Sequence, residues 1–189
     1  MDPDGPSTVA LTIGASPWRR HLPDPQAVCR RAVEATLERV PIPPWLARAE
    51  VGVLLADDAT VRRLNADHRG LDHATDVLSF PTFEHILQDA PGRLPPGPVP
   101  LGDVVLALET VRAEAAAERK PFLDHVSHLL VHGCLHLLGY DHQRAEDAAR
   151  MEELERAILE HLGIPDPYAD AAARPLSAAG TKPALETRS

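Results

Sequence analysis

The sequence has little of what marks secreted, disulfide-rich or membrane proteins. It contains only two cysteines, Cys29 and Cys134, which are too far apart for a disulfide framework or a four-cysteine zinc site. Its apolar runs fall short of the roughly 20 residues that span a bilayer, and its first residues lack a basic stretch followed by an apolar one. We therefore expect two buried apolar thiols and a cytoplasmic chain without a membrane partner.

Basic residues are also scarce relative to acidic ones. The chain has 19 lysines and arginines against 28 aspartates and glutamates, a formal net charge of −9. This charge argues against a broadly basic nucleic-acid surface, although it leaves room for a local basic groove. The length of 189 residues suits one domain with a substantial core.

Hydrophobic periodicity predicts strands interleaved with helices. Alternating or compact apolar runs predict strands at 9–13, 51–55, 75–81 and 102–107. Helical spacing and capping residues predict helices at 24–40, 57–70, 109–120, 122–138 and 144–162. This alternation favours a small α/β or α+β fold in which helices pack against a sheet.

Three segments are expected to lie outside these elements. Residues 1–7 are expected to form a flexible N-terminus, and residues 84–100, with five prolines, a long surface loop. Large apolar residues nearly vanish after Pro165, so residues 165–189 are expected to form a disordered tail without a part in the chemistry. The single domain is therefore predicted to span residues 8–164.

Five of the ten histidines fall between residues 125 and 142, and three of them have the spacing of metal ligands. His132 and His136 are four residues apart on a predicted helix, so both rings can place a nitrogen about 2 Å from one zinc ion. His128 would lie about 12 Å along the axis from His136, too far to share that ion. Gly139 is suited to end the helix in a left-handed conformation, and His142 follows it as the expected third ligand.

Three neutral imidazoles leave the full charge of the ion available, which lowers the pKa of a bound water to about 7. Cys134 lies about 200° around the helix from His132 and is a poor fourth ligand, so a position stays open for water. His125 and His128 are expected to be packing, surface or outer contacts of the site. The alternative is that the spacing arises by chance in a histidine-rich helix, with rings that are solvated or hydrogen-bonded.

Three blocks of the sequence resemble one family. Residues 132–142, His-Gly-Cys-Leu-His-Leu-Leu-Gly-Tyr-Asp-His, are similar to the HGxLHLxGYDH signature of the bacterial YbeY family of rRNA maturation factors and endoribonucleases. Residues 64–81 resemble its LNxxxRxxDxxTDVLSFP segment, and residues 101–105 its LGDIxI strand. The similarity covers roughly residues 50–160, and three blocks in the right order are highly specific.

The resemblance implies an α+β domain with a central mixed sheet of four strands and a metal site on a helix and turn in its C-terminal half. It implies zinc on His132, His136 and His142, and Arg69 as the functionally important arginine. It also implies single-strand-specific RNA cleavage, maturation of the 3′ end of 16S rRNA and ribosome quality control. The implied partners are RNA of the small ribosomal subunit, with ribosomal proteins or other ribonucleases.

The expected reaction is metal-assisted hydrolysis of a phosphodiester bond. Zinc would polarise a phosphoryl oxygen or supply hydroxide, and Arg69 would contact the phosphate. From the residues alone, Arg69 could equally pair with Asp72 or Asp76. A zinc peptidase is a weaker alternative, because Gly133 stands where zincin peptidases carry their glutamate. A non-catalytic, zinc-stabilised assembly factor is the other alternative.

The acidic net charge makes local cations important for an RNA enzyme, because phosphate contacts dominate RNA affinity. Arg62, Arg63 and Arg69 lie on or near one predicted helix and could form such a patch. A solvated helix face explains Arg62 and Arg63 equally well.

Overall fold

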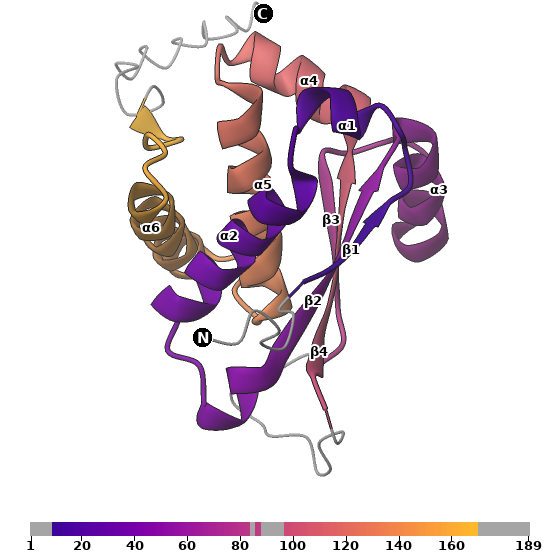
Figure 1. Cartoon of the computed structure of the whole chain (residues 1–189). Helices are drawn as coiled ribbons and strands as arrows, with labels where there is room; N and C mark the ends of the chain where they lie inside the picture. The colour runs from indigo at the N-terminus through magenta and orange to yellow at the C-terminus, as the bar shows by residue number, and fades with distance from the viewer. Residues whose placement is uncertain (1–8, 84–85, 88–96, 170–189) are drawn as a thin grey trace, which may run out of the picture.

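The alternating apolar segments form a four-stranded sheet within residues 9–83, 86–87 and 97–169, which the computed structural model describes. The strands are β1 (Val9–Ile13), β2 (Ala49–Ala56), β3 (Val77–Pro81) and β4 (Val99–Ala107). They lie in the order β1-β2-β4-β3, with β1 and β4 parallel to β2 and β3 antiparallel to β4 (Figure 1). The mixed sheet and its helices confirm the predicted α+β class.

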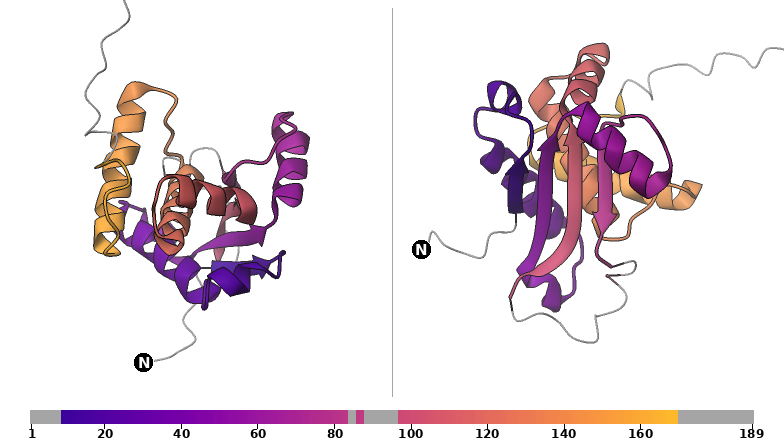
Figure 2. Two further views of the ribbon diagram at one scale, coloured as in Figure 1. Left: turned by 90° about the horizontal axis from the view of Figure 1, so that it is seen from above. Right: turned by 90° about the vertical axis from the view of Figure 1, so that its right-hand side faces the viewer.

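Six α-helices and one 3-10 helix accompany the sheet in the described residues. They are α1 (Trp18–His21), α2 (Pro25–Arg39), η1 (Pro44–Arg48), α3 (Asp58–Arg69), α4 (Leu108–Ala117), α5 (Phe122–Leu137) and α6 (Ala145–His161). The right-hand view of Figure 2 shows α3 in front of the sheet and α5 and α6 behind it. Asp24 caps α2 and Asp57 caps α3 through their side chains, while Gly70 ends α3 with a φ of 70°.

Helix α5 lies in the middle of the helical layer. It contacts α2, α4 and α6 and packs on β3 and β4. Gly133 makes this close packing possible, because a Cβ at that position would lie 2.7 Å from Cγ1 of Val104 and 3.2 Å from Oγ of Ser79. The backbone of α5 therefore approaches the sheet between His132 and His136, the two ligands predicted on this helix.

The short elements α1 and η1 were not predicted, because tertiary contacts and not local periodicity hold them. Trp18 is fully buried, and its Nε1 donates a hydrogen bond to the carbonyl of Ala56 at 2.7 Å. The expected loop at 84–100 is partly wrong, since β4 already begins at Val99 and Ile86 is buried in the core. Residues 84–85 and 88–96 of that loop lie outside the described residues.

The ends of the predicted domain are only partly described. Residues 1–7 and 170–189 lie outside the described residues, so the expectations for them stay predictions. Residues 165–169 are described and differ from the expected tail, because Tyr168 donates a hydrogen bond to Glu155 of α6. Among the helices described, none has the length and apolar character to cross a membrane.

We predict that Gly133→Ala destabilises the chain. Alanine normally favours a helix interior by about 1 kcal/mol over glycine. Here the added methyl group overlaps Val104, so we expect a net loss of about 1–3 kcal/mol in the free energy of unfolding, measured by urea denaturation. Gly97→Ala is the control, because a Cβ there meets no atom within 4 Å. A Gly133→Ala variant as stable as the wild type would contradict the close packing of α5.

We also predict that neither cysteine reacts with iodoacetamide in the folded chain at mildly alkaline pH. Cys29 and Cys134 are buried, and burial raises the pKa of each thiol to about 12. The thiolate is the reactive form, so both thiols stay inert until the chain unfolds. Mass spectrometry should show no alkyl group on the folded protein and two on the unfolded protein; rapid labelling of the folded protein would contradict this burial.

Candidate metal centre

The three predicted histidines converge at the C-terminal end of α5. His132 and His136 lie one turn apart, and their Nε2 atoms are 3.0 Å from each other. The ring of His142, beyond the helix, has its centroid 5.7 Å from that of His132 and 5.1 Å from that of His136. One nitrogen of each ring lies within 4.8 Å of the other two, so a single cation can contact all three.

The turn after α5 brings His142 back to the helix. Gly139 has a φ of 89°, the left-handed conformation predicted for it. The backbone N–H of Tyr140 donates to the carbonyl of Leu135, and that of Gly139 donates to the carbonyl of His136, both at 3.0 Å. This pair of hydrogen bonds is the Schellman arrangement that ends many helices.

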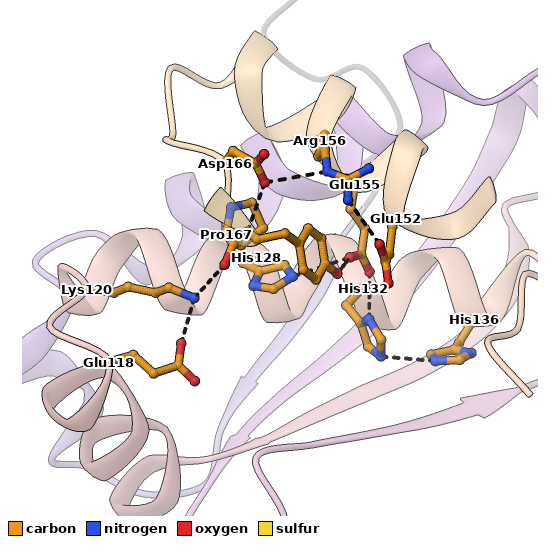
Figure 3. A network of polar contacts seen from close by, with 11 residues as sticks. Glu118, Lys120, His128, His132, His136, Glu152, Glu155, Arg156, Asp166 and Pro167 are labelled. Carbon is orange, nitrogen blue, oxygen red and sulfur yellow. Dashed lines mark hydrogen bonds and ion pairs between the residues drawn. The ribbon is translucent and has the colours of Figure 1, made fainter. Parts of the chain in front are cut away.

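Both helical rings use their Nδ1 atoms to bind acceptors. His132 Nδ1 lies 2.6 Å from Oε1 of Glu155 (Figure 3). His136 Nδ1 lies 2.9 Å from the carbonyl oxygen of Tyr140. The ionised carboxylate and the carbonyl only accept, so Nδ1 of each ring carries a hydrogen, and the lone pair of a neutral ring is then on Nε2. The two Nε2 atoms are 3.0 Å apart, close enough for a single cation to contact both.

The protonation states of the site suit metal binding. Burial, with a contribution from the neighbouring imidazoles, lowers the pKa of His136 to about 4, so the ring is neutral. Burial acts to raise the pKa of Glu155, but hydrogen bonds from His128, His132 and Tyr168 outweigh it and lower that pKa to about 2. Metal ligands must be deprotonated, and a carboxylate behind a histidine ligand is a common supporting partner.

The other histidines of α5 lie toward its N-terminus and contact carboxylates instead of the cluster. His125 is buried, with Nε2 3.3 Å from Glu114, and His128 Nε2 lies 3.4 Å from Glu155. Together with Tyr168 they line a cleft of about 770 Å³ that reaches His132. Cys134 is buried in the core, and the metal-ligand cluster found among the described residues does not include it.

The structure does not place Arg69 among the three histidines. It is the last residue of α3, which covers the face of the sheet opposite α5 (Figure 2). The exposed side chain of Arg69 makes no hydrogen bond or ion pair with any residue in the described ranges. Its two alternative partners are engaged elsewhere, because Asp72 pairs with Arg62 at 2.6 Å and Asp76 accepts from the N–H of Val77.

The edge strand β3 lies between the end of α3 and the metal centre. On one face the ring of His68 packs against Phe80, with centroids 4.8 Å apart. On the other face Ser79 approaches Gly133 of α5. Arg69 follows His68 in α3 and therefore lies on one side of β3, whereas the histidines of α5 lie on the other side.

Sequence reasoning missed Glu155 and Tyr168. A signal for Glu155 was available, because it lies on the buried stripe of α6 between Met151 and Ile158, where a carboxylate is unusual. No comparable signal marked Tyr168. The predicted arginine patch is smaller than expected, because Asp72 balances the charge of Arg62.

Comparison with known proteins identifies the family of the chain. Residues 20–163 match the family model described as Endoribonuclease YbeY. The chain is 51% identical over 170 residues to Endoribonuclease YbeY of Bradyrhizobium diazoefficiens, covering 89% of this chain and 88% of that protein. It is 48% identical over 162 residues to the protein of the same name from Paramagnetospirillum magneticum, covering 86% and 96%.

A solution structure of a Thermotoga maritima protein matches with a TM-score of 0.54 at 21% identity, covering 92% of this chain and 99% of that one. At this identity the match supports the fold alone. The family model and the curated relatives decide the family, since they agree over most of the chain. The chain belongs to the endoribonuclease YbeY family.

Proposed function

We propose that this chain is a cytoplasmic, zinc-dependent endoribonuclease that hydrolyses phosphodiester bonds in single-stranded ribosomal RNA. Its proposed roles are maturation of the 3′ end of 16S rRNA and ribosome quality control. The observation that carries the proposal is the convergence of His132, His136 and His142, with the Nε2 atoms of the first two 3.0 Å apart. The relatives named endoribonuclease support RNA as the substrate.

Zinc fits the donor set best. Three imidazole nitrogens with one open position are typical of catalytic zinc sites, whereas structural zinc sites have four protein ligands. Bound there, zinc supplies a Lewis acid that polarises a phosphoryl oxygen. The chain supplies the rest: Glu155 and the carbonyl of Tyr140 orient two of the rings.

Arg69 is proposed to bind the RNA backbone. Its guanidinium offers a planar fork of donors that matches a phosphate, and no described residue occupies it. An RNA strand that crosses the edge of β3 can reach both Arg69 and the histidines. Because the chain carries a net charge of −9, we propose that ribosomal proteins or other ribonucleases help to bring it to the small subunit.

The geometry disfavours a peptidase. A glutamate after His132 would serve as the general base in a zincin peptidase, but Gly133 lies against Val104 and Ser79 with no room for a side chain. The remaining rival is an assembly factor in which zinc only stabilises the turn after α5.

We predict that the purified chain binds about one zinc ion and that His136→Ala loses both the ion and RNA cleavage. Metal content is measured by mass spectrometry, and cleavage on single-stranded 16S precursor RNA, with unfolded casein as the peptidase substrate. His161→Ala is the matched control, because His161 lies on the exposed face of α6 beside Arg39.

Three results would contradict the proposal in different ways. RNA cleavage that persists after chelation, or in His136→Ala, would show that the reaction does not need the metal. Cleavage of casein favours the peptidase. A chain that binds zinc, melts at a lower temperature on chelation and cleaves neither substrate is the assembly factor.

We predict that Arg69→Ala retains zinc but lowers kcat/KM for RNA by about 10- to 100-fold, as expected for losing hydrogen bonds to a charged group. The loss should shrink as salt rises, because one phosphate contact is gone. Arg30→Ala removes an exposed arginine from α2 and serves as the control. Unchanged cleavage in Arg69→Ala would exclude a role for this residue.

A further inference from the structure

A polar chain connects the C-terminal segment to the metal centre. The hydroxyl of Tyr168 donates to Oε2 of Glu155, and Oε1 of the same carboxylate lies 2.6 Å from Nδ1 of His132. Figure 3 shows Glu155 of α6 between His132 and the segment that holds Asp166 and Pro167. One buried carboxylate thus joins a residue near the end of the described chain to a metal-site ring.

The segment is tied both to α6 and to Lys120, which follows α4. Asp166 accepts a hydrogen bond from the N–H of Tyr168 at 2.8 Å and lies 3.6 Å from Nε of Arg156. The guanidinium of Arg156 lies 5.0 Å from the centre of the Tyr168 ring. On the other side, Nζ of Lys120 donates to the carbonyl of Pro167 at 3.1 Å. These contacts fix where the Tyr168 hydroxyl lies.

Because Glu155 is buried, the hydrogen bond from the Tyr168 hydroxyl helps to stabilise its charge. Only 1% of the residue is exposed, so its negative charge depends on protein donors and not on water. Without Tyr168, the remaining contact of Oε2 is Nε2 of His128 at 3.4 Å, a long hydrogen bond. The carboxylate would then be less firmly held, and so would the ring of His132 that it orients.

We propose that Tyr168 is a positioning residue of the metal centre, which fixes Glu155 and through it the tautomer and orientation of His132. The proposal rests on the metal site of the proposed function but not on the reaction. It assigns a role to a residue outside positions 20–163, the part that matches the family model. Metal affinity therefore depends on the segment that follows α6.

The test compares zinc affinity in full-length variants by competition with a chelating dye, together with the visible absorption of the cobalt-substituted protein. Tyr168→Phe removes the hydroxyl and keeps the ring beside Arg156. Thr36→Val is the control, because it deletes another buried hydroxyl, one that donates only within α2. Glu155→Gln keeps the shape of the central link and removes its charge.

We expect zinc affinity to fall by about tenfold in Tyr168→Phe and about 10- to 100-fold in Glu155→Gln, and to stay unchanged in Thr36→Val. The cobalt spectrum of Tyr168→Phe should shift, because the orientation of a ligand ring changes.

Wild-type affinity and an unchanged cobalt spectrum in Tyr168→Phe would overturn this inference alone. A wild-type chain that binds no zinc would overturn both this inference and the proposed function. If the wild type binds zinc but cleaves no RNA, only the proposed reaction fails, and the affinity comparison still decides the role of Tyr168.

Discussion

The candidate metal centre depends on how closely α5 packs on the sheet. Because Gly133 has no side chain, this helix lies directly on Val104 of β4 and on the edge strand β3. Its remaining sides are covered by α2, α4 and α6, which leaves its C-terminal end to present His132 and His136 to the returning turn. Gly133 thus has two effects: it leaves no room for a peptidase-type glutamate, and it allows α5 to pack closely on the sheet.

The electrostatics of the site then follow from burial. An ionised Glu155 inside the fold needs donors, and it obtains them from two histidines and a tyrosine. A cation held by His132 would add positive charge beside the same carboxylate. Such a local positive centre would let a chain with a net charge of −9 accept a phosphate where its average surface would repel one.

The sequence predicted the parts of the site that depend on local geometry. His132 and His136 are close because of the helical repeat, and Gly139 marked the turn that returns His142. The sequence could not predict contacts between distant segments, such as the hydrogen bond of Trp18 to Ala56 of β2. Nor could it predict that the carboxylate of Glu155 on α6 lies against the ring of His132 on α5. The placement of Arg69 across the sheet could not be predicted either, because periodicity does not say which face a helix covers.

The most direct test is anomalous diffraction at the zinc absorption edge from crystals of the full chain grown with zinc. We expect one strong peak about 2 Å from Nε2 of His132, Nε2 of His136 and a ring nitrogen of His142. Nδ1 of His132 should remain on Glu155. A peak that contacts Nδ1 of His132, lies at His125 and His128, or leaves out His142 would contradict the arrangement on which the proposed chemistry depends.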